Sequence, residues 1–237
     1  MRERPVSAVP KTALLLLALG LCAQLWWHFS HPRAPAAASS LPIAPSLESA
    51  RLASLGEPIA LSKLLLLYVQ GFDDQPGVQA AFRQLDFERV KNWLGLTLQL
   101  DPRGQYPLFL ASRVYGEVGD PARQRIMAEF VFQQFSVDPN RRWDALANVA
   151  ITTRHRMNDL VSAERYARAL REQTTSPEVP DWARQMDIFM LADMQQYPRA
   201  LQLLDGLIQG GDISDVNELR FLRERRERMV MDAANKK

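Results

Sequence analysis

Cysteine is nearly absent from this chain of 237 residues, because Cys22 is the only one. A single thiol cannot form a disulfide within the chain, and it cannot build a thiolate metal site. Histidine is scarce as well: the chain has 3, and only His155 lies beyond position 31. Since paired histidine ligands such as HExxH are missing, we expect no metal site.

Glycine-rich motifs are missing too. None of the 11 glycines forms a Rossmann fingerprint, a phosphate-binding loop or a G-x-S-x-G nucleophile elbow. The net charge of +2 gives the chain no strong attraction for nucleic acid. We therefore expect no cofactor, no nucleic-acid partner and no enzymatic activity.

The remaining route to catalysis is a pair of carboxylates that converge in a cleft, as in glycosidases. The candidate pairs are Asp73 with Asp74, Glu117 with Asp120, and Asp187 with Asp193. The first pair reads as a turn, the second includes a helix cap, and the third has a spacing of six that does not share a helix face. A helical enzyme of the cell envelope, such as a wall-modifying hydrolase, is therefore the alternative function.

A long uncharged apolar run occupies residues 12–29 and reads TALLLLALGLCAQLWWHF. As a helix it would reach roughly 27 Å, enough to span the hydrocarbon of a bilayer. Arg2, Arg4 and Lys11 precede it, and such a basic flank stays in the cytoplasm. We expect residues 1–11 to be cytoplasmic, 12–29 to be an uncleaved transmembrane signal anchor in the inner (plasma) membrane, and the rest to be periplasmic.

Two other interpretations of the N-terminal segment compete with the anchor. A cleaved signal peptide would use the alanines at 36–38, but these lie well past the end of the apolar run. A lipoprotein signal would modify Cys22, but Leu21 stands where such signals have a small residue. A cleaved signal would export the domain as well.

Residues 30–47 contain four prolines and many small side chains, so we expect a semi-extended spacer that holds the domain off the bilayer. The helical domain is expected from 48 to 231. Its first apolar run, Leu64 to Leu67, is too short to span a membrane and predicts a buried core helix.

Recurring helix stops organise the rest of the chain. The segments LQLDP, FSVDP and QTTSP end at Pro102, Pro139 and Pro177, at intervals of 37 and 38 residues. Asp120 and Asn158 are the expected N-caps of the second helices, Gly210-Gly211 ends a further one, and 214–231 suits a charged capping helix. Each interval holds two helices of roughly 14 to 18 residues, and such hairpins must stack to bury their apolar faces.

These segments resemble tetratricopeptide-type repeats over residues 86–211. LQLDP and FSVDP end as their second helices often do, and YPRALQLLDGLI (197–208) and AERYARAL (163–170) are similar to those helices. The period exceeds the usual 34, and Val78, Tyr115 and Thr153 replace the small residue of the first helix. The resemblance implies an all-α, right-handed stack of antiparallel hairpins, a degenerate TPR-like solenoid, that binds proteins without catalysis.

One polar stripe is the candidate partner-binding site. It runs along the helix at 141–157 and consists of Arg141, Asn148, Thr152 and His155. In tetratricopeptide-like stacks the first helix of each hairpin lines the concave groove, so the stripe would face a ligand peptide. The alternative is an ordinary solvated helix face. Residues at core spacing are Trp93, Trp143, Leu146, Ala150, Met157 and Trp182.

The sequence therefore predicts a membrane-anchored extracytoplasmic scaffold or adaptor that binds other proteins. An accessory role in an envelope assembly or secretion complex fits this topology.

Overall fold

The computed structural model describes residues 10–30, 40–73, 85–210 and 215–235. Within these ranges all regular structure is helical and no strand occurs, which confirms the predicted all-α class. The elements are α1 (Lys11–Ser30), α2 (Leu47–Ala53), α3 (Pro58–Gln70), α5 (Phe87–Leu100), α6 (Tyr106–Phe109), the π-helical η2 (Leu110–Val114), the 3-10 turn η3 (Tyr115–Glu117), α7 (Pro121–Phe135), α8 (Pro139–His155), α9 (Leu160–Gln173), α10 (Asp181–Arg184), α11 (Met186–Asp193), α12 (Tyr197–Gly210) and α13 (Val216–Ala234).

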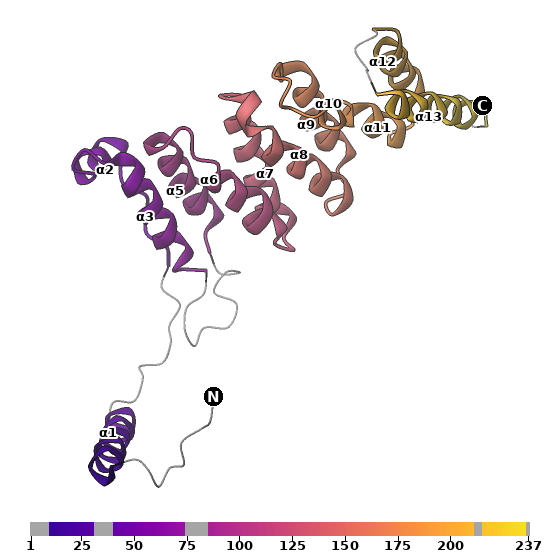
Figure 1. The fold of residues 1–237 in the computed structure, drawn as a ribbon. Coiled ribbons are helices and arrows are strands. Elements are labelled where there is room, and N and C mark those ends of the chain that lie inside the picture. The colour runs from indigo at the N-terminus through magenta and orange to yellow at the C-terminus, as the bar shows by residue number, and fades with distance from the viewer. Residues whose placement is uncertain (1–9, 31–39, 74–84, 211–214, 236–237) are drawn as a thin grey trace.

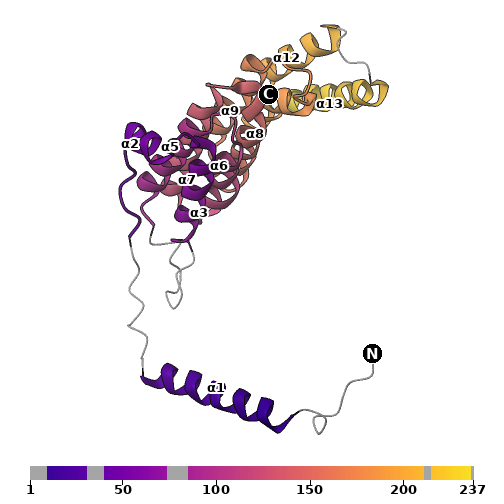
Figure 2. The same cartoon turned by 60° about the vertical axis from the view of Figure 1, so that its left-hand side comes forward.

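From α2 onward the helices follow one another along an elongated row, with α2 and α3 at one end and α12 and α13 at the other (Figures 1 and 2). Helices that are neighbours in the chain pack together, as α3 does with α5, α8 with α9, and α12 with α13. One continuous apolar core runs from the segment before α2 to α11, and a smaller one joins α11, α12 and α13.

The helices end where the predicted stops lie. α5 ends at Leu100, directly before Asp101-Pro102, and α8 begins at Pro139. α9 ends at Gln173, ahead of Pro177, and α12 ends at Gly210, while Gly211 lies outside the described residues. Proline at the first helical position has no amide hydrogen to leave unsatisfied, which suits these boundaries.

One of the two predicted N-caps is confirmed and the other is wrong. The Asp120 carboxylate accepts hydrogen bonds from the amides of Ala122 and Arg123, at 2.9 and 3.3 Å. At α9 the cap is Asp159, whose carboxylate accepts from the amide of Ser162 at 3.0 Å. Asn158 instead has a φ of 53°, the left-handed conformation that asparagine tolerates beyond a helix end.

Two of the predicted first helices are not regular. Between Asp101 and α7 the chain forms the short α6, then η2 and η3, because Pro107 limits the first turn and Gly116 closes the last one. A Cβ at Gly116 would lie 2.9 Å from the Ala111 carbonyl oxygen, so only glycine fits this close approach. Similarly, a break at Gln185 separates α10 from α11.

The prediction that Leu64 to Leu67 form a buried core helix is wrong. Leu66 is buried, but Leu64 and Leu67 are 62% and 65% exposed, because α3 packs on α5 with one face only. Trp93 is buried as expected. Trp182 is 50% exposed and meets Trp143 edge-on, so it is not a core residue.

Parts of the predicted spacer at 30–47 belong to the folded elements, while residues 31–39 lie outside the described residues. Ser30 belongs to α1, and Leu41 is buried in the core. The Leu41 carbonyl accepts from Arg89 Nη1 at 2.7 Å, and the Pro42 carbonyl accepts from Trp93 Nε1 at 2.8 Å. The segment before α2 is thus part of the domain.

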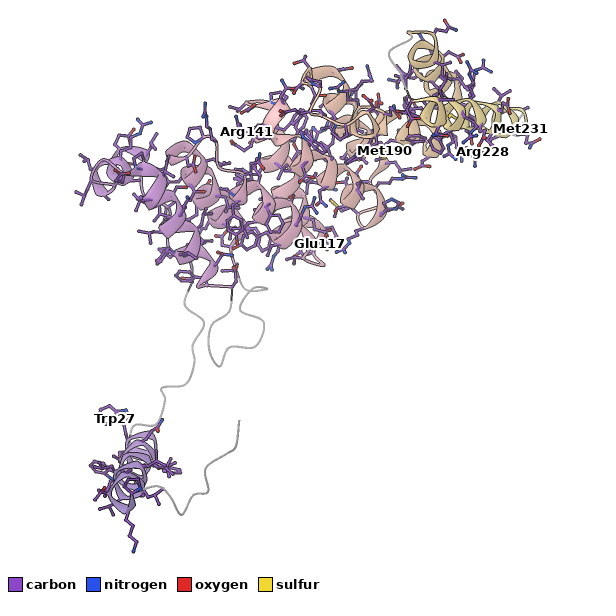
Figure 3. The ribbon with its side chains drawn as sticks, viewed as in Figure 1. Trp27, Glu117, Arg141, Met190, Arg228 and Met231 are labelled. Atoms are coloured by element: carbon purple, nitrogen blue, oxygen red, sulfur yellow. The ribbon has the colours of Figure 1, made fainter. Side chains whose placement is uncertain are left out.

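α1 is apolar, and all of its described side chains are exposed (Trp27 is labelled in Figure 3). By length and hydropathy, no single helix of the described residues meets the requirements of a membrane span, and Lys11–Trp27 counts as a shorter apolar helix. α2 and α3 meet them only as a pair, with a bend of 109° between them. The transmembrane segment at 12–29 stays a prediction.

A buried side chain at the start of α8 is hydrogen-bonded to the ends of two earlier helices. Arg142, at the start of α8, is 4% exposed and donates from Nη1 to the Gln134 carbonyl at 2.7 Å and from Nη2 to the Pro102 carbonyl at 3.0 Å. Burial lowers the pKa of this guanidinium, and charged hydrogen bonds offset that cost. Arg142 therefore holds α8 against the ends of both α5 and α7.

The start of α8 is also hydrogen-bonded to the segment that follows α9. The Asn140 side-chain oxygen accepts from the amides of Thr175 and Ser176, at 2.8 and 2.9 Å. Its nitrogen donates to the Thr175 hydroxyl at 3.1 Å. Arg184 of α10 then donates to the carbonyl of Ser176. The stop segments are thus hydrogen-bonded to the start of the following first helix.

Replacing Arg142 with methionine should lower the free energy of unfolding by about 2 kcal/mol, because two buried carbonyls lose a charged donor. Arg141→Met is the matched control, since Arg141 is exposed and pairs only with Asp138 at 3.2 Å within its own helix start. It should cost less than about 0.5 kcal/mol. Urea unfolding of the full chain in detergent measures both, and equal losses would contradict the role given to Arg142.

A second buried polar contact joins α3 to η3. The hydroxyl of Tyr115, which is fully buried, donates to both carboxylate oxygens of Asp73, at 3.0 and 2.9 Å. Burial raises the pKa of Asp73 to about 6, although the hydrogen bond from Tyr115 lowers it. Burial and the Asp73 charge raise the pKa of Tyr115, which keeps the phenol a donor.

Stability should therefore fall as pH rises from about 4 to 7. The pKa of Asp73 is higher in the folded chain, at about 6, than in the unfolded chain, at about 3.9, so the folded state is favoured below pH 4 and this advantage is lost through pH 6. Because Asp73 is only half-buried, we expect about 1 kcal/mol rather than the full shift.

The measurement is the difference in unfolding free energy between the natural chain and Asp73→Asn at pH 4 and at pH 7. The variant should be relatively more stable at pH 7. Tyr115→Phe removes the donor that stabilises the carboxylate and should enlarge the loss. A difference that does not change with pH would refute the assignment.

Candidate protein-binding groove

A groove runs across α3, α6 and α8. Its larger hollow, about 430 Å³, lies between α3 and the segment leading into α6, and a second hollow, about 260 Å³, lies between α6 and α8. Gln105 and Tyr106 border both hollows, so the two adjoin at these residues. We call them together the α3–α6–α8 groove.

Two aromatic side chains form the wall at the middle of the groove. Tyr106 and Phe109 stack with ring centroids 5.8 Å apart and an angle of 12° between the rings. They are 46% and 45% exposed, so about half of each ring is free for a ligand. Gln70 of α3 donates to the Tyr106 hydroxyl at 2.9 Å, which fixes the ring across the gap between hairpins.

The floor of the groove is apolar and buried, and its rim is charged. Leu66 and Pro107 lie under the first hollow, and Leu108 and Ala145 lie under the second. The charged residues that border the two hollows are Lys63, Asp101, Arg141, Arg142 and Asp144. An apolar floor with a few convergent polar groups is the usual make-up of a binding site.

The two exposed charged side chains that α8 places on the rim, Arg141 and Asp144, each form an ion pair with a neighbouring residue. Both Asp144 oxygens accept from Arg113 Nη2 of η2, at 3.1 and 3.2 Å, and this pair ties α8 to η2. The exposed Arg141 bonds to Asp138 through Nε, which leaves its terminal nitrogens for a ligand. A carboxylate or a backbone carbonyl of a peptide could accept from them.

A second aromatic pair joins α8 to α10. Trp143 near the start of α8 and Trp182 at the start of α10 meet edge-on, with centroids 5.7 Å apart. Trp182 is 50% exposed, whereas Trp143 is half-buried and packs against the main core.

The predicted stripe does not come together as one site. Arg141 borders the groove, whereas His155 is exposed at the other end of α8, about 21 Å away at 1.5 Å per residue. Figure 3 shows Arg141 on one edge of the row and Glu117, the ion-pair partner of Arg156, on the opposite edge.

The two middle residues of the stripe are half-buried. Asn148 has a buried side-chain oxygen. Thr152 borders a small internal cavity of about 10 Å³ together with Ser112, Gln124 and Thr153. A partner that binds at the groove therefore meets Arg141 but not the rest of the stripe, whose role stays a prediction.

The three carboxylate pairs have structural partners where the chain is described. Glu117 pairs with Arg156, and Asp120 caps α7. Asp187 is buried and accepts from Arg171 Nε at 2.6 Å, and Asp193 pairs with Arg154. Asp73 binds Tyr115, while Asp74 lies outside the described residues.

Metal-binding geometry is not found in the part of the chain that the structure describes: no three His, Cys, Asp or Glu side chains gather there. The groove has the chemistry to hold apolar or aromatic side chains on its floor and to bond a peptide backbone at its rim. The signal that sequence reasoning missed was QYPLF directly after a stop, which places two aromatic residues three apart on a first turn.

Comparison with known proteins found no matching family model, no similar curated protein and no similar solved structure.

Proposed function

We propose that this protein is a membrane-anchored extracytoplasmic scaffold that holds a peptide segment of a partner protein in the α3–α6–α8 groove. The observation that carries the proposal is the pair of stacked, half-exposed rings of Tyr106 and Phe109, which stand over an apolar floor between successive hairpins. Aromatic residues dominate the energetics of protein interfaces because they bury a large area with few rotamers.

The irregular backbone beside these rings supports the same assignment. α6 runs directly into the π-helical η2, and π-helical turns are frequent at functional sites. A continuous α-helix would need neither this turn nor the close approach of Gly116 to Ala111. The distortion sets the first turn of α6 between α3 and α8.

Hairpins packed in chain order also support a right-handed, TPR-like solenoid, because such stacks expose a continuous surface along their first helices. The apolar α1 and its basic flank support an anchor at 12–29 in the inner membrane. An envelope assembly or secretion complex is the setting that suits an anchored peptide-binding domain.

The groove is tested by photocrosslinking in living cells. A benzophenone amino acid in place of Phe109 should crosslink the partner, whereas the same group in place of Val161, which is 68% exposed on α9, should not. A crosslink to the same protein from Val161 alone would refute the groove. Recovery of a wall polymer at either site would favour the envelope hydrolase.

Two sets of variants compare the groove with the predicted stripe. Tyr106→Ala with Phe109→Ala should remove most of the recovered partner, with about 1 kcal/mol of lost stability for two half-exposed rings. Asn148→Ala, Thr152→Ala and His155→Ala together should leave recovery unaltered. If only the second set of variants fails to recover the partner, the binding site is the predicted stripe and not the groove.

The topology has its own test. A reporter fused after Lys237 should be active if it functions only in the periplasm and inactive if it functions only in the cytoplasm, because the basic flank before 12–29 holds the N-terminus inside. The opposite pattern would reject the extracytoplasmic location while leaving the groove untouched.

A further inference from the structure

We infer that the N-terminal end of the helical row lies on the surface of the lipid bilayer. The contact consists of Leu52 on α2, Leu55 in the following turn and Ile59 at the start of α3, which we call the N-terminal face. The inference rests on the anchor in the proposed function, which brings this end to the membrane, but it does not depend on the groove.

The two ends of the row differ in how many charges surround their exposed apolar side chains. The last helix, α13, exposes Val216, Phe221, Val230 and Met231, but these lie among charged side chains that are also exposed: Arg220, Arg223, Glu224, Glu227 and Arg228, the last labelled in Figure 3. At the other end, Leu52 and Ile59 are 80% and 51% exposed, and exposed charged side chains are fewer. Because the terminal units of helical stacks need a polar outer face to remain soluble, the apolar end requires a covering surface.

Leu55 is the strongest single indication. It is 92% exposed and has a φ of 50°, in the left-handed region, and Gly56 follows with a φ of 93°. A leucine gains nothing from burial in the domain at this position, and its backbone conformation favours glycine or asparagine. A large apolar side chain there is explained by something outside the domain that takes it up.

The connection to α1 identifies the bilayer as that surface. The ten peptide steps from Ser30 to Ser40 reach at most about 35 Å. Leu41 is then buried, and its carbonyl and that of Pro42 bind α5, the helix on which α2 and α3 pack. The chain from the anchor thus joins the domain at its apolar end, and α13 lies at the far end (Figures 1 and 2).

The shape and charge of this end suit the interface between headgroups and acyl chains. α2 and α3 together are as apolar as a membrane span, but the 109° bend prevents them from crossing as one straight helix. A bent pair of this kind can still place its exposed apolar side chains among the acyl chains while its charged groups stay at the headgroups. The exposed Arg51 lies beside Leu52 in α2 and can reach lipid phosphates.

Spin labels on the full chain in vesicles test the contact. The natural Cys22 in α1 accepts one label, and Cys22→Ser allows a single label at Leu55→Cys or, as control, at Val216→Cys on α13, which is 77% exposed. The vesicles contain three parts phosphatidylcholine to one part phosphatidylglycerol. Collision with oxygen, which concentrates in lipid, is compared with collision with a water-soluble nickel chelate.

The ratio of oxygen to nickel collisions should be several-fold higher at Leu55 than at Val216, and higher still at Cys22. If the Leu55 label meets nickel as freely as Val216 does while Cys22 is in lipid, the inference is overturned and the anchor stands. Shielding of Leu55 from both reagents means contact with a protein or a second copy, which also overturns it. A Cys22 label in water rejects the anchor, whatever Leu55 shows.

Folding of the labelled chains is checked by circular dichroism, and Leu52→Cys gives a second position on the same face. Leu55→Asn provides a separate measurement, because asparagine suits the left-handed turn. This variant should keep the stability of the domain. In the same variant, a label at Leu52→Cys should lose part of its oxygen preference, and an unchanged preference would count against the role of Leu55.

Discussion

The buried guanidinium of Arg142 joins α8 to two earlier parts of the helical row. It sits at the start of α8 and donates to carbonyls at the ends of α5 and α7, where helix ends leave acceptors without partners. Asn140 joins the start of α8 to the segment after α9. Because these contacts lie at the helix boundaries, they fix the edge of the row at which the first helices begin.

The groove forms because α6 and α8 begin side by side at that edge. With the first turns of α6 and α8 held in line, Tyr106 and Phe109 are presented beside α3, and Arg113 joins η2 to Asp144 of α8. The rings can remain half-exposed because the floor beneath them is already closed by Leu108 and Ala145. The hydrogen bonds at the helix ends and the apolar core therefore stabilise the domain. The half-exposed rings of the groove contribute little to that stability, so they are available to a ligand.

Local chemistry was readable in the sequence, and tertiary contacts were not. The Asp-Pro stops and the Asp120 cap follow from the backbone needs of helix ends, so they were predicted correctly. The break at η2 depends on the approach of Gly116 to Ala111, and the exposure of Leu64 depends on α3 lying at the end of the row. The spacing of residues within one helix cannot predict either of these features. The stripe from Arg141 to His155 was predicted from such spacing alone, so it could not account for the contacts between helices.

We propose that the edge fixed by Arg142 carries the partner. Hydrogen exchange of the full chain in native membrane vesicles, compared with the purified chain in detergent, measures this directly. We expect the added protection in the vesicles to be greatest over the first turns of α6 and α8, with α9 unchanged. Protection confined to the last turns of α8 around His155, or none along the first helices, would contradict it.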